Sequence, residues 1–141
     1  MFSHVPREFL VNPDRPVSPH LQIYRWPLAM VISILHRITG AALAIGALLL
    51  VVILLSIAVG PGAYDVLRAY ISTGPGQVFL ILWTLALFLH LFNGVRHLVF
   101  DAGLGFGIEA TRISGIVVLL ATVVFTVAVW LVAWLHHGMQ A

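Results

Sequence analysis

The chain of 141 residues lacks cysteine and lysine altogether, and it carries little charge of either sign. Without cysteine it can form no disulfide, and it can supply no thiolates to an all-cysteine iron–sulfur cluster. Charged residues make up only 9% of the chain and hydrophobic residues 61%, whereas a soluble domain averages about 25% charged. The net charge is +2 with no basic stripe, so no nucleic-acid partner is expected. The composition predicts an integral membrane protein.

Three apolar segments are each long enough to cross a bilayer, which takes about 20 apolar residues in a helix. The prediction is an all-α fold with three transmembrane helices. Its parts are an N-terminal segment at 1–27, helices at 28–59, 77–101 and 113–137, an outer loop at 60–76 and an inner loop at 102–112. The first helix is longer than a simple span. Its opening, 28–37, carries polar residues, so we expect that part to lie at or below the membrane surface.

The arginines predict how the chain is oriented. Six of the seven lie before the first span, in its opening turns, or beside the other spans on the same side, and only Arg68 lies in the opposite loop. Such a bias places the N-terminus in the cytoplasm, or in a mitochondrial matrix, and the C-terminus outside. The first 27 residues lack the apolar stretch of a signal peptide and are not acid-free and serine-rich like a transit peptide. We therefore expect a multi-pass protein of a bacterial inner membrane, surrounded by lipids, with the mitochondrial inner membrane as the alternative.

Two histidines stand seven residues apart in the second apolar segment. On a helix, His90 and His97 fall within roughly 20° of one face, with Gly94 between them and Asp101 one turn beyond. Ionisable groups inside a membrane are costly and usually mark a functional site. The missing side chain at Gly94 would let a flat group lie against the backbone, and a haem fits that description.

A second polar stripe lies on the first apolar segment. Ser33, His36, Arg37 and Gly40 share one helical face. Snorkelling of the arginine to headgroups is one interpretation, and close helix packing at the glycine is another. Neither explains why a hydroxyl and an imidazole share the face with the cation. We expect the stripe to form a shared site with the histidines of the second span.

The depths of these groups match the polarity of a haem. His90 is expected about 9 to 10 Å further into the bilayer than His97 and Arg96. A neutral histidine hydrogen-bonded between helices is the alternative. A haem iron commonly takes a histidine nitrogen, and its propionates need cations or donors. His90 would then meet the iron, with Arg37, Arg96 and His97 at the polar edge.

No other histidine is expected at the depth of His90. His36 is placed too near the inner interface, and His136 and His137 end the third span on the opposite side. The second axial ligand of such a haem is therefore expected from another chain.

Three stretches of the chain carry a family resemblance: 15–27, 33–40 and 90–103. They resemble the cytochrome b large membrane-anchor subunit of succinate dehydrogenase, respiratory complex II. The pattern Ser-x-x-His-Arg-x-x-Gly, followed by His-x-x-x-Gly-x-Arg-His-x-x-x-Asp, is specific to that family. The resemblance extends from about residue 14 to the end of the third span.

The resemblance assigns roles to individual residues. It implies that His90 is an axial ligand of haem b, shared with a histidine of a small membrane-anchor subunit. Ser33 and Arg37 match residues that border a ubiquinone pocket, which the iron–sulfur subunit and the small anchor complete. His36, Arg37 and His97 match positions near the haem propionates.

The resemblance also implies a place in the respiratory chain and the tricarboxylic acid cycle. The flavoprotein subunit would oxidise succinate, so this chain would be a non-catalytic subunit at the quinone end of the complex. Asp101, at the end of the second span, is a candidate proton relay and equally a structural partner for an arginine. Two other classes remain: a stand-alone membrane cytochrome b, and a haem-free channel or transporter subunit whose histidines relay protons.

Overall fold

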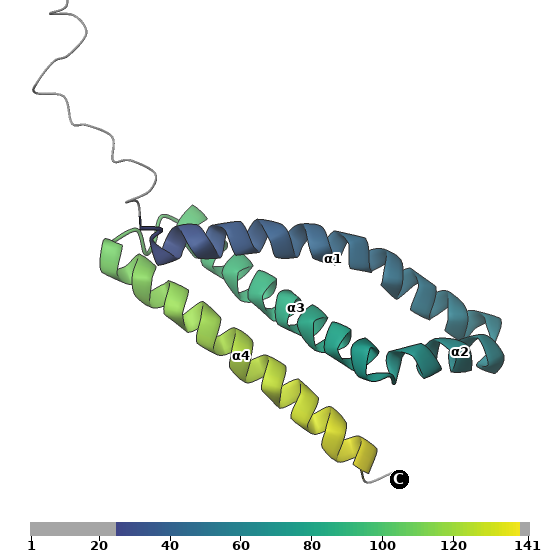
Figure 1. The fold of residues 1–141 in the computed structure, drawn as a ribbon. Helices are drawn as coiled ribbons and strands as arrows, with labels where there is room; N and C mark the ends of the chain where they lie inside the picture. Colours follow the sequence, from purple (N-terminus) through teal and green to yellow (C-terminus); the bar gives the residue numbers. More distant parts are fainter. Residues whose placement is uncertain (1–24, 139–141) are drawn as a thin grey trace, which may run out of the picture.

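The computed structural model describes residues 25–138, and there every regular element is an α-helix (Figure 1). The four helices are α1 (Leu28–Val59), α2 (Pro61–Ile71), α3 (Gly74–Asp101) and α4 (Ile108–Gly138). Most of the predicted N-terminal segment lies outside the described residues. The same holds for all but the last three residues of the first stretch that carries the resemblance.

Three of these helices are long and apolar enough to cross a membrane: Leu28–Val59, Gly74–Asp101 and Ile108–His136. The predicted all-α class with three spanning helices is therefore confirmed. At 1.5 Å per residue, the 32 residues of α1 extend over about 48 Å, against about 30 Å for the hydrocarbon core. Part of α1 must consequently lie outside that core or cross it at a tilt.

The segment predicted as the outer loop contains the additional helix α2. Its amphipathic sequence follows Gly60, whose φ of 130° requires a glycine, and begins at Pro61. Proline suits the first turn of a helix, because the N–H it lacks would have no partner there. The Gly-Pro pair therefore ends one helix and begins the next, where the sequence alone indicated only a break.

Two helices also begin earlier than predicted. Helix α3 begins at Gly74, because Thr73 caps it by accepting a hydrogen bond from the N–H of Gly76 at 3.2 Å. Helix α4 begins at Ile108, with Glu109 in its first turn, where a carboxylate favours the helix dipole. The inner connection shortens to 102–107 as a result.

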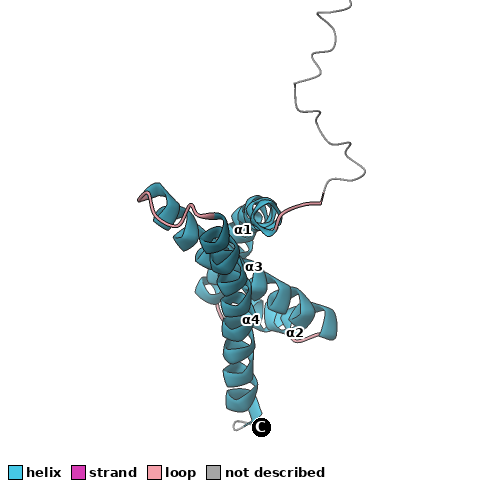
Figure 2. Cartoon of the chain, turned by 90° about the vertical axis from the view of Figure 1, so that its left-hand side faces the viewer, coloured by secondary structure: helices cyan, strands magenta, loops and turns pink. Residues whose placement is uncertain are grey.

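Helix α3 occupies the middle of the arrangement, with α1 on one side and α4 on the other, and α2 bridges the ends of α1 and α3 (Figure 1). Figure 2, turned by 90°, shows the described residues as helices joined by short connections. Glycines allow the close approaches: Trp83 of α3 lies against Gly46 of α1, and Ile32 of α1 lies against Gly115 of α4.

The described residues bury more polar than apolar side chains. The buried large apolar residues are Ile32, Leu89 and Val118, and the buried polar ones are Thr39, Asn93, Arg96, Thr122 and Thr126. Most large apolar side chains of the three long helices face outward. This is the distribution expected of a chain surrounded by lipid and other apolar helices, where polar groups must find partners between helices.

Candidate functional site

Three histidines gather between α1 and α3. The ring of His36 on α1 stacks on that of His90 on α3, with centroids 3.9 Å apart and planes at 6°. On its other side, His36 meets His97 at a centroid distance of 5.1 Å and a tilt of 47°. His36 therefore joins the two histidines of α3 into one cluster.

Two glycines flank this contact, and the absence of a side chain at Gly40 is what makes it sterically allowed. Both helices carry His-x-x-x-Gly, at residues 36–40 of α1 and 90–94 of α3, and each glycine lies beside the histidine of the other helix. A methyl group at Gly40 would place its carbon 2.8 Å from Cε1 of His90, and one at Gly94 would lie 3.8 Å from Cε1 of His36. The motif is reciprocal, because α1 and α3 run in opposite directions (Figure 1).

This contact bears on two predictions. His36 is predicted to lie nearer the interface than His90, and the contact between their rings leaves that prediction standing. Counted from the ends of α1 and α3, the two residues lie about 12 and 16.5 Å along their helices, a difference that two side chains bridge. The surface next to Gly94 faces the edge of the His36 ring, and its use by a flat group stays a prediction.

The hydrogen bonds of His90 determine which of its nitrogens carries the proton. Its Nδ1 lies 3.1 Å from the carbonyl oxygen of His36 and 3.3 Å from Oγ1 of Thr39. A carbonyl oxygen can only accept, so Nδ1 must be the donor. In the neutral ring the lone pair then lies on Nε2, which makes no hydrogen bond within the described residues. Nε2 is thus the nitrogen of His90 that could bind an added group.

Thr39 is a site residue that the sequence prediction missed. Its hydroxyl donates to the carbonyl oxygens of Leu35 and His36, at 2.8 and 3.0 Å, as helical threonines commonly do. Nothing local indicated that its oxygen would also meet a histidine of another helix. A search for hydroxyls three or four residues beyond His36 on α1 would have found it.

One polar atom of the cluster has no partner in the described part of the chain. Nδ1 of His36 is buried and makes no hydrogen bond there. Buried polar atoms of native proteins nearly always find a partner. The cluster therefore has bonding capacity directed at a group outside these residues. Within residues 25–138, no three side chains of the types His, Cys, Asp and Glu are arranged to hold a metal ion.

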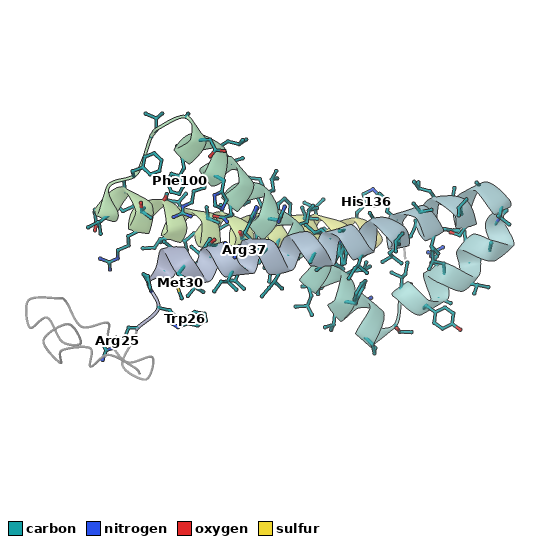
Figure 3. The ribbon with its side chains drawn as sticks, turned by 90° about the horizontal axis from the view of Figure 1, so that it is seen from above. Arg25, Trp26, Met30, Arg37, Phe100 and His136 are labelled. Atoms are coloured by element: carbon teal, nitrogen blue, oxygen red, sulfur yellow. The ribbon has the colours of Figure 1, made fainter. Side chains whose placement is uncertain are left out.

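Ser33 and Arg37 lie one turn apart on α1, as predicted. The Ser33 side chain is half-buried and that of Arg37 is exposed. Figure 3 shows Arg37 well along α1 from Arg25 and Trp26. Among the interactions of the described residues, neither Ser33 nor Arg37 forms a hydrogen bond or an ion pair. Both side chains are consequently available to an external partner.

Asp101 and the two terminal histidines lie apart from this cluster. Asp101 is the last residue of α3, exposed, and without an ion pair in the described segment. His136 is exposed near the far end of α4 (Figure 3), and the side chain of His137 lies outside the description. The structure therefore does not bring them to the histidines between α1 and α3.

Arg96 lies on another face of α3, directed at α4, which corrects its predicted place at the polar edge of the haem. It is 7% exposed. Its Nε donates to Oγ of Ser114 at 3.0 Å and its Nη2 to the carbonyl of Thr111 at 3.3 Å. Nη1 lies 3.4 Å from Oδ1 of Asn93, and Cζ lies 4.5 Å from the centre of the Phe100 ring. Six residues beyond a given position, a helical side chain points about 120° away, toward α4 and not toward α1.

Comparison with known proteins identifies the family to which the chain is similar. Residues 11–129 match the family described as succinate dehydrogenase/fumarate reductase transmembrane subunit. The chain is 40% identical to the succinate dehydrogenase cytochrome b556 subunit of Paracoccus denitrificans, over 81% of this chain and 88% of that one. It is also 40% identical to the corresponding subunit of Rickettsia bellii, over 82% and 90%. Identity to the mitochondrial cytochrome b560 subunit of Sus scrofa is 40%, over 81% and 69%.

Proposed function

The chain belongs to the succinate dehydrogenase/fumarate reductase transmembrane subunit family, and we propose that it is the cytochrome b large membrane anchor of a succinate:quinone oxidoreductase. In this role it holds the flavoprotein and iron–sulfur subunits at the membrane, together with a small membrane-anchor subunit. It helps to bind haem b and to form the site where ubiquinone is reduced. The chain itself contributes no succinate-oxidising site.

The orientation of His90 is the observation that carries this proposal. The ring is held inside a membrane-spanning helix with its proton on Nδ1, bonded to the carbonyl of His36, so Nε2 is presented as a haem ligand. Histidine nitrogen is a common axial ligand of haem iron, and the haem supplies a one-electron carrier when bound. The glycine next to each ring leaves room for the histidines to be placed there.

The second axial ligand is proposed to come from the small anchor subunit. Two axial ligands bind iron from opposite faces of a haem, but the rings of His36 and His90 lie parallel at 3.9 Å. That separation is ordinary van der Waals contact, so no group fits between them. His36 therefore serves elsewhere, and with His97 and Arg37 we assign it to the haem propionates, where donors and cations are needed.

Ser33 and Arg37 are proposed to bind the quinone head. The two residues lie one turn apart on α1 and have no partners among the described residues. A hydroxyl and a guanidinium directed at a quinone oxygen stabilise negative charge that develops there in a partly dry site. The iron–sulfur subunit and the small anchor complete the pocket, and Asp101 at the end of α3 relays protons to it.

The proposed location is a bacterial inner membrane with the N-terminus in the cytoplasm. Arg25, Arg37, Arg96 and Arg112 all lie at the α1-start and α3-end side of the three spans, and Arg68 of α2 lies at the other. A reporter active only in the cytoplasm should work at the N-terminus and fail at the C-terminus. Activity at the C-terminus would overturn this orientation.

The test of the function is isolation of the intact complex through a tag on this chain. We expect four different subunits, succinate-to-quinone activity, and haem b bands in a reduced-minus-oxidised spectrum. Haem bands without flavoprotein would identify a stand-alone membrane cytochrome b. A complex without haem bands would favour a channel or transporter subunit and overturn the proposal.

A further inference from the structure

The side chain that orients His90 most directly is the hydroxyl of Thr39. It is 9% exposed, and its oxygen lies 3.3 Å from Nδ1 of His90. Its own hydrogen is directed at carbonyl oxygens of α1. An oxygen whose proton is already donated offers its lone pair, so Thr39 accepts part of the Nδ1 hydrogen bond.

Other buried threonines do not have this second contact. Thr122 and Thr126 of α4 are also buried, at 2% and 5% exposed, and each donates to a carbonyl one turn earlier at 2.7 Å. Neither hydroxyl meets a histidine in the described structure. Bonding to its own helix is therefore the general use of a buried threonine here, and contact with His90 is particular to Thr39.

We propose that Thr39 is a positioning residue for His90, and the proposal rests on the haem ligation argued above. Thr39 shares the Nδ1 proton with the carbonyl of His36, which keeps that proton off Nε2 and holds the ring in its orientation. The stacked ring of His36, 3.9 Å away, limits rotation on one face. Together these contacts from α1 present Nε2 of α3 as a ligand of defined direction.

The contact has an electronic consequence that can be measured. A histidine ligand that donates its other N–H to an acceptor becomes a more basic ligand. A more basic ligand favours ferric over ferrous iron, because the higher charge gains more from the donated electrons. The Thr39 hydroxyl should consequently lower the reduction potential of the haem that His90 ligates.

The decisive variant is Thr39→Val, which removes the hydroxyl and keeps a similar shape. Loss of an outer-shell partner of a metal-ligating histidine typically costs ten- to a hundredfold in metal affinity. This loss should fall mainly on ferric iron, which gains more from a basic ligand, and because the carbonyl of His36 remains we expect about a tenfold loss in the preference for ferric haem. For a one-electron couple, tenfold corresponds to a rise in potential of about 59 mV.

The experiment is a redox titration of the haem absorbance in the intact complex. Thr39→Ser, which keeps the oxygen, should retain the wild-type potential. The matched control is Thr126→Val, the same substitution at a buried threonine that does not contact histidine, and it should also leave the potential unchanged. The low-temperature electron paramagnetic resonance spectrum of ferric haem, which reports ligand orientation, should change only in Thr39→Val.

The outcomes distinguish a failure of the proposed haem binding from a failure of the role given to Thr39. If the wild-type complex contains no haem, the proposed function fails. If the wild type contains haem and Thr39→Val has the same potential and spectrum as Thr126→Val, haem ligation stands and the role of Thr39 is overturned. Should Thr39→Val not assemble, the pair Thr39→Ser and Thr39→Ala supplies the same comparison, because both side chains are smaller than threonine and they differ by one oxygen.

Discussion

Helix α3 carries two polar clusters on different faces, and they differ in how completely their atoms are bonded. Toward α1, the histidine cluster leaves Nδ1 of His36 without a partner in the described residues. Nε2 of His90 likewise makes no hydrogen bond there. Toward α4, three nitrogens of Arg96 donate to acceptors within the chain, and the Phe100 ring covers the guanidinium. The first cluster is open to an added group, and the second is largely closed on itself.

The comparison shows that a polar residue in a membrane span does not identify a functional site by its presence alone. Arg96 is the more costly group to place in a membrane, since it carries a permanent charge. Yet its bonds connect α3 to α4, which is a structural task. Only Nδ2 of Asn93 in that cluster lacks a partner among the described residues. The clusters differ in which group is bonded: every nitrogen of the Arg96 guanidinium has an acceptor, whereas Nε2 of His90 has no hydrogen bond in the described residues.

The largest expected effect comes from removing the proposed ligand. His90→Ala should abolish the six-coordinate haem spectrum of the complex, because within residues 25–138 no other histidine occupies the position of its Nε2. Absorbance per assembled complex is the measurement. Arg96→Leu, on the other face of α3, should keep the haem band at wild-type intensity per complex. A normal bis-histidine spectrum in His90→Ala would contradict the assignment.

A smaller effect is expected at the quinone end. Ser33→Ala should lower succinate-to-quinone turnover roughly ten- to a hundredfold. One hydrogen bond to a charged or developing-charge group is worth about 1.5–3 kcal/mol, and each 1.36 kcal/mol is about tenfold in rate. Reduction of an artificial acceptor that bypasses the membrane should survive.

The matched control is the same substitution in the closed cluster. Ser114→Ala removes an equivalent hydroxyl that bonds Arg96, and it should leave quinone turnover unchanged. If Ser33→Ala assembles and keeps full quinone activity, the hydroxyl of Ser33 has no part in the quinone site.

Arg96→Leu should reduce stability and leave the chemistry intact. The variant loses two hydrogen bonds to α4, a third within α3, and the contact with Phe100. At about 0.6 kcal/mol for each side-chain bond between membrane helices, we expect a loss of about 2 kcal/mol in all. The measurement is the thermal denaturation temperature of the purified complex.

Arg37→Leu is the matched control, because Arg37 is exposed and lacks a described partner. It should lose quinone activity, which Arg96→Leu retains, and it should lower the denaturation temperature less than Arg96→Leu does. If Arg37→Leu were the less stable variant and Arg96→Leu the less active one, the structural role of Arg96 and the quinone-binding role of Arg37 would both be contradicted.

The smallest expected effect is the stability change in Ser114→Ala. It removes one acceptor of Arg96, while the bonds to Thr111 and Asn93 remain. We expect a loss of about 0.6 kcal/mol, a fraction of that in Arg96→Leu. A loss as large as in Arg96→Leu would mean that the Ser114 hydroxyl carries most of the connection between α3 and α4.

Local properties of the chain account for what could be predicted. Apolar length identifies the three spans, and the bounds of the first, 28–59, agree with α1. The 3.6-residue period correctly places His90 and His97 on one face, since His36 contacts both rings. Proline next to glycine was less informative, because the sequence indicates only a break at such pairs. In the structure the proline of each pair lies in the first turn of a helix, α2 in one case and α3 in the other.

The sequence by itself determined the class of the molecule, its helices and the faces on which polar residues lie, because these follow from hydropathy and helical periodicity within one segment. Only the tertiary structure decided that His36 reaches His90, that Thr39 holds its Nδ1, and that Arg96 turns to α4. These depend on how far each helix is shifted along its neighbour and how it is rotated about its axis. Both quantities depend on side chains packed between helices, such as His90 against Gly40, and no single segment contains that information.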